Sequence, residues 1–374
     1  MLVDQNLWEC FLKFEENHEE AVARAMSICS NFFGADWKNG EFKIKKMVGG
    51  YTNLVFKCSI PQGFSDITDT ILRIQCSKDA MQLQTELVVF MKLAENGLGP
   101  KLLGVFPGGR LEEYIPSRTV TPEECMEPKY SALIAQTLAK IHQIDMPLTK
   151  KSRMIPTMRQ WLTKIEKLGG DEFELWSKNA HVPKEMFPAT INLESMREEI
   201  DRIEKYLEKT TSPTLFIHGD VYATNILLRE DCPKKESPVV IIDFEFGQYN
   251  YRGFDLAVHF NLLALTYCLS FPTCTEFAQK LTDQTIHKSF LEGYLQETYE
   301  LLKREGLPCG NHGLSGDMEQ DLGTLETEAM SFKAVLNFWW ALWDIICDLE
   351  GKKFLDFYNA WRDRMTLYYY LKDF

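Results

Sequence analysis

The sequence has no Cys-x-x-Cys pair and no zinc-ligand spacing, although it contains ten cysteines. It also lacks an excess of basic residues, since 41 Lys and Arg stand against 54 Asp and Glu, for a formal net charge of −13. Scattered cysteines are typical of a protein in the reduced cytosol. The acidic balance argues against nucleic-acid or anionic-membrane partners, which need a basic surface, and is compatible with a cationic substrate.

Long apolar runs are missing as well. The first six residues contain no basic segment ahead of an apolar stretch, so no secretory signal is visible. The most apolar segments, residues 256–271 and 335–347, include polar side chains or fall short of the roughly 18 residues of a membrane span. We therefore expect two buried helices there, in a cytoplasmic protein with no membrane span.

The 374 residues, 45% of them hydrophobic, are enough for a large buried core in two or three domains. After helices expected within residues 7–33, the pattern changes to short β-prone runs separated by turn residues. The runs predict a five-stranded antiparallel sheet with one helix, residues 81–96, between its third and fourth strands. The expected strands are residues 42–48, 54–60, 70–74, 102–106 and 110–115.

From Pro116 onward the pattern is mostly helical, beginning with residues 130–143. This change predicts an α+β protein with a boundary near residues 115–121. We expect an N-terminal nucleotide-binding lobe at 1–115 and a C-terminal catalytic and substrate-binding lobe at 116–374. Residues 306–323, rich in glycine and acidic side chains, are predicted to form a surface loop.

A polar loop lies between two apolar runs within residues 215–228. It carries His218, Gly219 and Asp220, and Asn225 follows five residues after the aspartate. This spacing matches the catalytic loop of protein kinases, where the aspartate accepts the proton of the substrate hydroxyl and the asparagine binds magnesium. We predict that Asp220 is the catalytic base and that Asn225 is a magnesium ligand.

A second carboxylate ends the next apolar run. Asp243 stands eighteen residues after Asn225 and begins Asp243-Phe244-Glu245, where protein kinases carry Asp-Phe-Gly. Mg²⁺ prefers hard oxygen ligands, which these side chains supply. Each motif alone is common, but the two in this order predict an ATP- and Mg²⁺-dependent phosphotransferase of the protein-kinase-like, two-lobe fold.

The expected N-terminal sheet offers further groups for the nucleotide. Gly50, Thr52 and Asn53 lie in the turn between the first two strands, where backbone N–H groups would approach phosphates, with a plain turn as the alternative. Arg73 on the third strand and Glu86 on the following helix occupy the places of the kinase lysine–glutamate pair, with a surface ion pair as the alternative. We expect these residues to bind ATP.

Three features of protein kinases are absent from the sequence. Gly219 replaces the arginine of His-Arg-Asp, Glu245 replaces the glycine of Asp-Phe-Gly, and no Ala-Pro-Glu follows. The sequence therefore lacks the signatures of an activation segment. This favours a small-molecule substrate over a protein substrate.

The stretch 243–260 resembles the choline/ethanolamine kinase family, whose pattern includes Tyr-Asn-Tyr-Arg-Gly-Phe-Asp, present here at residues 249–255. Residues 49–53, 98–102, 109–118 and 338–343 resemble the same family in the same order. The resemblance extends over about residues 26–369. It implies phosphorylation of choline by ATP, the first step of phosphatidylcholine synthesis by the CDP-choline route, in a protein that is commonly a homodimer.

The resemblance also implies roles for individual residues. Glu245 would contact a second metal, and the backbone around Glu113 and Ile115 would bind adenine. A quaternary ammonium is best held by ring faces. The aromatic side chains implied for this role are Tyr267, Trp340, Trp343 and Tyr358, with Phe246 beside them.

The sequence departs from the family at three positions. Phe246 stands in place of a tyrosine, Val258 in place of an asparagine, and Leu262 in place of an acidic residue near the cation. Loss of that carboxylate counts against an ethanolamine kinase, because a primary ammonium needs hydrogen-bond acceptors. The same catalytic motif would also suit an aminoglycoside-type phosphotransferase, and the aromatic residues would suit a catalytically silent binding module.

Overall fold

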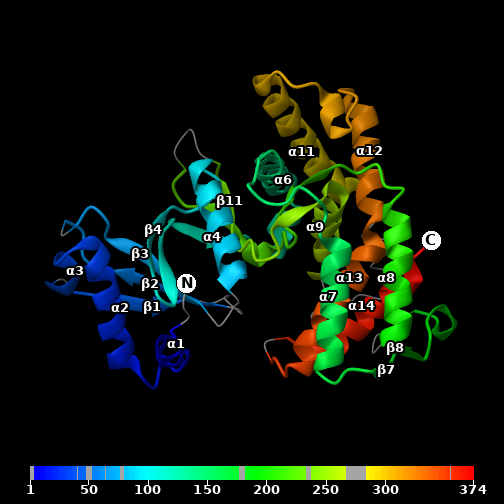
Figure 1. The fold of residues 1–374 in the computed structure, drawn as a ribbon. Helices are drawn as coiled ribbons and strands as arrows, with labels where there is room; N and C mark the ends of the chain where they lie inside the picture. Colours follow the sequence, from blue (N-terminus) through cyan, green and yellow to red (C-terminus); the bar gives the residue numbers. More distant parts are fainter. Residues whose placement is uncertain are drawn as a thin grey trace. The chain divides into compact units, whose positions relative to one another are not determined.

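The computed structural model describes residues 4–39, 41–47, 53–63, 65–75, 80–176, 182–232, 237–266, 284–353 and 355–374. The chain forms two compact units (Figure 1). The first unit comprises residues 1–118 and 227–245, and the second comprises 119–226 and 246–374. The segment 227–245 thus returns to the first unit. The assignment of nucleotide and substrate binding to lobes 1–115 and 116–374 stays a prediction.

The first unit contains a five-stranded antiparallel sheet in the order β1-β2-β3-β5-β4. Its strands lie close to the predicted ones: β1 Lys43–Lys46, β2 Asn53–Ser59, β3 Asp69–Gln75, β4 Leu102–Phe106 and β5 Gly109–Glu113. Helix α4, Ala80–Glu95, connects β3 to β4, as expected. A three-stranded sheet follows, formed by β6 Ser117–Thr119, β10 Ile226–Arg229 and β11 Val239–Ile241.

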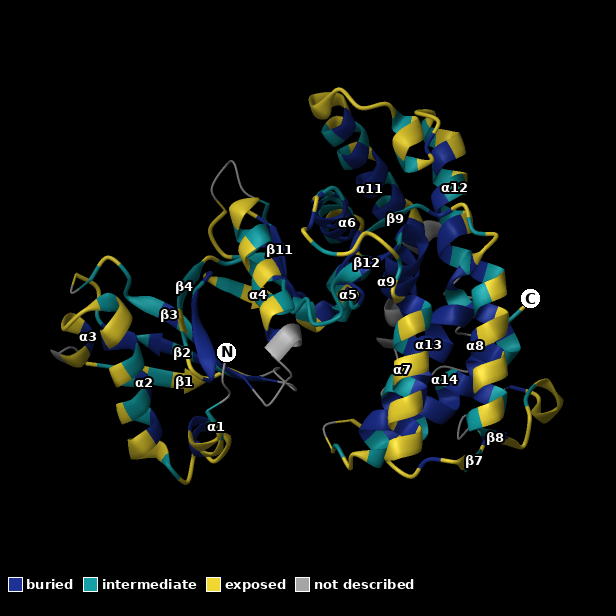
Figure 2. Ribbon diagram, viewed as in Figure 1, coloured by how far each residue is buried: buried dark blue, intermediate teal, exposed yellow. Residues whose placement is uncertain are grey.

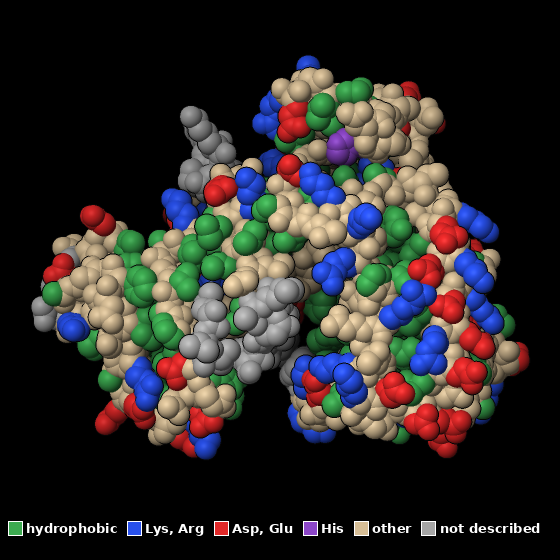
Figure 3. Space-filling model, in the orientation of Figure 1, with side chains coloured by type: hydrophobic (Ala, Val, Ile, Leu, Met, Phe, Trp, Pro, Cys, Tyr) green, Lys and Arg blue, Asp and Glu red, His purple; other side chains and the backbone are tan. Residues whose placement is uncertain are grey.

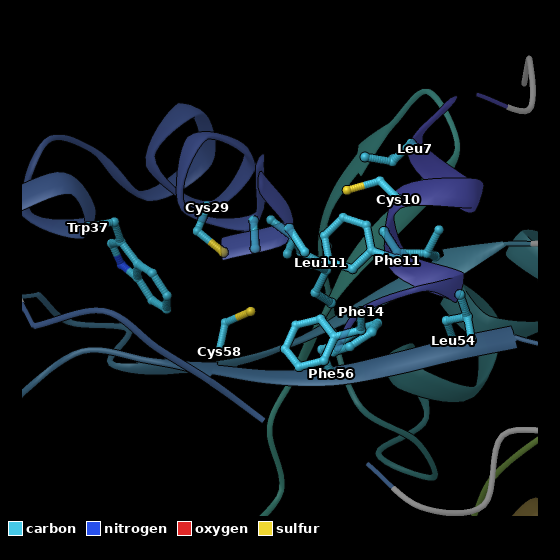
Figure 4. Close-up of a cluster of buried hydrophobic side chains, with 14 of the residues drawn as sticks. Leu7, Cys10, Phe11, Phe14, Cys29, Trp37, Leu54, Phe56, Cys58 and Leu111 are labelled. Atoms are coloured by element: carbon cyan, nitrogen blue, oxygen red, sulfur yellow. The ribbon is translucent and has the colours of Figure 1, made fainter. Parts of the chain in front are cut away.

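One face of the five-stranded sheet is covered by N-terminal helices. The helices are α1 Gln5–Leu12, α2 His18–Phe33 and α3 Asp36–Asn39. Side chains of β2 alternate between buried and half-buried, as in a strand with one covered face, and Phe56 packs 5.0 Å from the ring of Phe11. Figure 4 shows this core, in which the sulfur atoms of Cys29 and Cys58 are turned toward each other. The predicted helical stretch 7–33 therefore forms two helices that cover one face of the sheet.

The second unit is mainly helical. Its helices are α5 Pro122–Met126, α6 Pro128–His142, α7 Met154–Lys167, α8 Leu193–Leu207, α9 Arg252–Thr266, α11 Gln284–Glu305, α12 Met318–Ser331, α13 Lys333–Leu349 and α14 Phe357–Leu371. Two small antiparallel pairs accompany them, β7 Glu172–Glu174 with β8 Thr190–Asn192, and β9 Thr214–Ile217 with β12 Gln248–Tyr251. The predicted α+β class with an N-terminal five-stranded sheet is confirmed.

Helix α13 lies at the centre of one helix group in this unit. Thirteen of its 17 residues are buried, and α7 and α14 pack against it (Figure 2). Helices α6, α9, α11 and α12 form a second group through the contacts α6–α11, α11–α12 and α9–α12. Both predicted buried helices are found within described residues, at α9 and α13, while residues 267–271 lie outside the description.

The predicted loop at 306–323 is wrong over its last six residues, because α12 begins at Met318. Asp317 accepts a hydrogen bond from the N–H of Gln320 at 2.9 Å, which satisfies a donor at the start of the helix. Asp321 is buried and accepts from Tyr299 at 2.6 Å and from Ser315 at 2.8 Å. Two of the acidic side chains that suggested a solvated loop, Asp317 and Asp321, are therefore a capping group and a core group.

No helix in the described ranges is both long and apolar enough to cross a membrane. On the face of the second unit seen in Figure 3, acidic and basic side chains are intermixed over α7 and α8. Arg159 of α7, for example, pairs with Asp201 at 3.0 Å and Glu204 at 2.6 Å. The surplus of acidic residues does not form a patch of one sign on this face.

Candidate active site

The loop that follows β9 has a backbone conformation that requires glycine. Gly219 has a φ of +85°, and a Cβ added there would lie 2.9 Å from the Cβ of Phe246. The neighbouring N–H of Asp220 donates to Nδ1 of His218 at 3.1 Å. Gly219 therefore shapes the turn that presents Asp220, and it brings Phe246 against the same loop.

Asn225 fixes the carboxylate of Asp220 directly. Its Nδ2 donates to Oδ2 of Asp220 at 2.9 Å and to the carbonyl oxygen of Asp220 at 3.1 Å. The short 3₁₀ helix Ala223–Asn225 holds the two residues at this separation. Because the amide nitrogen faces Asp220, the amide oxygen of Asn225 is left as the atom that would bind a cation. The predicted spacing has therefore brought the expected base and the expected ligand into contact.

A buried carboxylate behind this loop holds its backbone. Asp255, at the start of α9, accepts from the N–H of His218 at 2.9 Å and from the N–H of Gly219 at 2.7 Å. Nε2 of His142 lies 3.0 Å from the same carboxylate. Burial alone would raise the pKa of Asp255, but the hydrogen bond from His142 and the groups of His218 hold it below its ordinary value. Asp255 is thus an ionised acceptor inside the fold.

Asp243 follows β11 in the first unit. Its φ of +67° makes it the one non-glycine residue with positive φ in the described part of the chain. Aspartate tolerates this region better than most residues, and such conformations gather at functional sites. Glu245, two residues later, is half-buried. Asp243 offers a hard oxygen donor of the kind that fits Mg²⁺. Among the described residues, no three His, Cys, Asp or Glu side chains gather as a metal cluster.

Arg73 pairs with a carboxylate that the sequence analysis missed. Its Nε donates to Glu112 at 2.8 Å, and Arg110, directly opposite Arg73 across β3 and β5, donates to the same oxygen at 2.8 Å. Burial works against the charge of Arg73, but Glu112 and Asp243 hold the pKa of its guanidinium above the ordinary value, with a smaller effect of Glu86. The charge of Glu86 thus acts on Arg73, and Glu112 is a hydrogen-bonded partner of Arg73.

The backbone at the end of β5 is partly engaged already. The N–H of Glu113 donates to the carbonyl of Lys101 at 2.9 Å, and the carbonyl of Ile115 accepts from Ser117 Oγ at 2.8 Å. Adenine would contact the N–H of Glu113 only by replacing its bond, whereas the carbonyl of Ile115 has a second lone pair with which to accept. Asn53 is buried at the start of β2, whereas the predicted phosphate contacts Gly50 and Thr52 lie outside the described residues.

Three of the predicted aromatic residues lie together. The ring centres of Trp340 and Trp343, three residues apart on α13, are 5.8 Å from each other. Phe246 lies 5.0 Å from Trp340 and 5.9 Å from Trp343. Phe357, at the start of α14, adds a fourth ring 5.8 Å from Trp343. We call these four side chains the aromatic cluster. Through Phe246 the cluster contacts the loop that carries Asp220.

Tyr358 belongs to a different group of side chains. Its ring lies 5.9 Å from Trp176, and the guanidinium of Arg362 lies 3.9 Å from its centre. Successive helix residues project about 100° apart, so Phe357 and Tyr358 face different directions. Phe357 is 2% exposed and Tyr358 is 49% exposed. The ring that accompanies Trp343 is therefore that of Phe357. Tyr267 lies outside the described residues, as does the side chain of Leu262.

Sequence reasoning missed Asp255, Glu112 and Phe357. Asp255 ends the Tyr-Asn-Tyr-Arg-Gly-Phe-Asp run, so the motif itself was the signal. Glu112 lies two residues after Arg110, and this period places both side chains on one face of a strand. For Phe357 the sequence gives no such signal, because the phase of α14 is set by its packing against α13.

Comparison with known proteins agrees with this geometry. The family model for choline/ethanolamine kinase matches residues 44–369. The human choline/ethanolamine kinase is 32% identical, over 87% of this chain and 80% of that protein. Choline kinase B2 of Caenorhabditis elegans is 30% identical, over 97% of this chain and 95% of that protein. The crystal structure of a choline kinase from Cryptosporidium parvum, 22% identical, superposes with a TM-score of 0.68 over 93% of this chain and 94% of that one, which confirms the kinase-like fold. The chain therefore belongs to the choline/ethanolamine kinase family.

Proposed function

We propose that this kinase transfers the γ-phosphoryl group of ATP to the hydroxyl of choline, giving ADP and phosphocholine, the first step of phosphatidylcholine synthesis by the CDP-choline route. One observation carries the proposal. Asp220, oriented by Asn225, lies on a loop that Phe246 connects to the aromatic cluster. A carboxylate that accepts a proton is thereby joined to ring faces that suit a permanent cation.

In this proposal the hydroxyl of choline donates its proton to Asp220 as the oxygen attacks the γ-phosphorus in line with the leaving ADP. The amide nitrogen of Asn225 keeps the carboxylate of Asp220 directed at the acceptor. Asn225 and Asp243 would be the residues that bind Mg²⁺, and Glu245 would contact a second ion. Bound magnesium neutralises the charge that develops on the phosphates.

The remaining predicted contacts serve the nucleotide. Arg73 binds a phosphate, together with Gly50, Thr52 and Asn53. Glu113 and Ile115 face adenine through their backbone. Because Glu112 already orients the guanidinium of Arg73, little rearrangement is needed when the phosphates bind. A location in the cytoplasm and assembly as a homodimer complete the proposal.

Choline is favoured over ethanolamine because the cluster offers rings rather than acceptors. A trimethylammonium group has no N–H to donate, so ring faces satisfy it fully. Ethanolamine would need carboxylate or carbonyl oxygens, and Leu262 stands where the family has an acid. The human relative carries both amines in its name, so ethanolamine kinase is the second candidate.

The test is release of ADP from ATP and Mg²⁺ with choline or ethanolamine as the acceptor. We expect kcat/KM to be higher for choline, and Asp220→Ala to lower kcat by about 10²–10⁴-fold. Asp231→Asn, a carboxylate on the surface loop after β10, is the matched control and should leave kcat unchanged. Turnover by Asp220→Ala equal to that of the unaltered protein would remove Asp220 as the base. A preference for ethanolamine would move the assignment to the second candidate.

A further inference from the structure

Three helices of the second unit bring polar side chains to one buried point behind the catalytic loop. His142 is the last residue of α6, Asp255 lies in the first turn of α9, and Tyr294 lies in α11. Their exposures are 2%, 0% and 0%. Nδ1 of His142 lies 2.7 Å from the hydroxyl of Tyr294, and Nε2 lies 3.0 Å from Asp255. The three side chains form a continuous row of hydrogen bonds.

The carboxylate of Asp255, at one end of this row, determines which nitrogen of His142 carries a proton. An ionised carboxylate only accepts, so Nε2 of His142 carries the proton that is donated to Asp255. Nδ1 of His142 faces the hydroxyl of Tyr294, which can donate a hydrogen bond or accept one. Burial raises the pKa of Tyr294, so its hydroxyl keeps its proton. Asp255 thus fixes the proton on Nε2 of His142, and Tyr294 holds the ring from its other nitrogen.

Both carboxylate oxygens of Asp255 accept hydrogen bonds from the loop, and one of them also contacts His142. Oδ1 accepts from the N–H of Gly219 at 2.7 Å, and Oδ2 accepts from the N–H of His218 at 2.9 Å as well as from His142. Without His142, the orientation of Asp255 would depend on the same two N–H groups that it is meant to hold. His142 adds a hydrogen bond to this carboxylate from a second helix, α6, outside the loop.

We infer that His142 is a positioning residue for the phosphoryl-transfer reaction, acting through Asp255 on the backbone that presents Asp220, with Tyr294 holding the other nitrogen of its ring. The inference rests on the proposed role of Asp220. A displacement of about 1 Å at a reacting group costs on the order of 10²-fold in rate, so loss of this support lowers kcat. Neither His142 nor Tyr294 lies among the side chains proposed to bind choline or nucleotide, so KM for both should change little.

Hydrogen exchange of the loop amides tests the positioning without relying on turnover. In His142→Ala, the amides of His218 and Gly219 should exchange at least about tenfold faster, while the amides of α13 keep their rates. In His142→Gln, the side-chain amide can donate to Asp255 and should restore much of the protection. In Tyr294→Phe, the ring of His142 loses its hydrogen-bonded partner at Nδ1. We expect a smaller acceleration of amide exchange at His218 and Gly219 than in His142→Ala.

Ser131→Ala is the matched control. Ser131 lies on the same helix as His142, is fully buried, and its hydroxyl has no hydrogen-bond partner among the described residues. This variant should leave the loop amides and kcat unchanged. His142→Ala should lower kcat by about 10- to 100-fold with KM for choline and ATP within about threefold.

The outcomes test the positioning role of His142 and the proposed kinase function separately. Unchanged exchange at His218 and Gly219 in folded His142→Ala, or an equal effect in Ser131→Ala, overturns the positioning role. If His142→Ala does not fold, folded Tyr294→Phe decides it, and unaltered exchange at His218 and Gly219 together with unaltered kcat in that variant counts against the positioning role. Absence of ADP release from the unaltered protein with either amine defeats the proposed function. The exchange result would still decide whether His142 holds the loop.

Discussion

Asp344 of α13 accepts a hydrogen bond from Nε of Arg364 of α14 at 2.9 Å, and the same guanidinium lies 5.9 Å from the ring centre of Trp340. Both side chains are nearly buried, with 3% and 11% exposure. The aromatic cluster is therefore bordered by a cation whose charge is balanced by a single carboxylate. Lys352, 5.5 Å from the Trp343 ring and 3.1 Å from Glu350, repeats the arrangement on the next tryptophan.

This balance predicts how the affinity for a cationic substrate responds to single charge changes. Asp344→Asn leaves the charge of Arg364 beside Trp340, and repulsion should raise KM for choline by about 3- to 10-fold. The double variant Asp344→Asn with Arg364→Met removes both charges and should return KM toward that of the unaltered protein. Steady-state kinetics with varied choline measures the effect.

The control for this prediction is KM for ATP in the same variants, which should stay within about twofold of the unaltered protein. Removing one partner of a buried pair destabilises a protein by about 3–5 kcal/mol, so the temperature of unfolding is followed in parallel. Equal KM for choline in Asp344→Asn and the unaltered protein would show that Arg364 does not influence the cation.

Asp344 also predicts a pH dependence of stability. Burial raises its pKa to about 6, and Arg364 offsets only part of that rise. Between the unfolded value of about 3.9 and a pH of about 6, the folded state holds a proton that the unfolded state has released. The contribution of Asp344 to the free energy of unfolding is therefore fully present below about pH 4 and is lost as the pH rises through 6.

Denaturant unfolding of the unaltered protein and of Asp344→Asn at pH 4, 5, 6 and 7 measures this contribution. As the pH rises from 4 to 7, the unaltered protein should lose roughly 2–3 kcal/mol of unfolding free energy relative to Asp344→Asn. His259, whose pKa burial lowers to about 4, changes stability in the opposite sense, but it is present in both proteins and cancels in the difference. A difference that is constant with pH would place the pKa of Asp344 at its ordinary value.

The sequence was sufficient to predict the parts of the fold that depend on local pattern. The alternation in β2 and the turn residues beside it predicted the sheet. The motif spacing predicted Asp220 and Asn225 as residues of one site, and the structure joins the two side chains by a hydrogen bond of 2.9 Å. Both depend on residues close together in the chain, where period and spacing determine geometry.

Features that depend on distant packing could not be predicted in the same way. Glu112 faces Arg73 because β5 pairs with β3, across 39 residues of sequence. The preference for Phe357 over Tyr358 beside Trp343 depends on the rotation of α14 about its axis, which the contact with α13 fixes. Neighbouring aromatic residues in a sequence do not reveal which of them faces a site.

That rotation gives a prediction about substrate binding. Phe357→Leu removes a ring from the aromatic cluster but keeps an apolar side chain, and KM for choline should rise about 3- to 10-fold. Tyr358→Leu is the matched control, because Tyr358 packs on Trp176 and Arg362 and should leave KM within about twofold. Titration of choline at saturating ATP distinguishes the two. A larger effect from Tyr358→Leu would assign the fourth ring of the site to Tyr358, as the sequence resemblance implied.

Glu112 predicts a coupling between stability and nucleotide binding in the first unit. Glu112→Gln leaves Arg73 and Arg110 as neighbouring buried cations without their shared carboxylate, which should lower the free energy of unfolding by about 3–5 kcal/mol. Arg73 also loses the group that orients it, so KM for ATP should rise while KM for choline stays unchanged. Thermal unfolding with and without ATP and Mg²⁺ measures both effects.

Arg110→Met distinguishes the effect of the buried charges from the effect of Glu112 on the orientation of Arg73. It removes one of the two cations while Glu112 keeps its bond to Arg73, so KM for ATP should rise less than in Glu112→Gln. Because Arg110 lies 4.6 Å from the Phe90 ring, methionine can retain part of that packing. If Arg110→Met raises KM for ATP as much as Glu112→Gln does, then Arg110 contacts the nucleotide itself. Orientation of Arg73 by Glu112 would then not account for the change in KM.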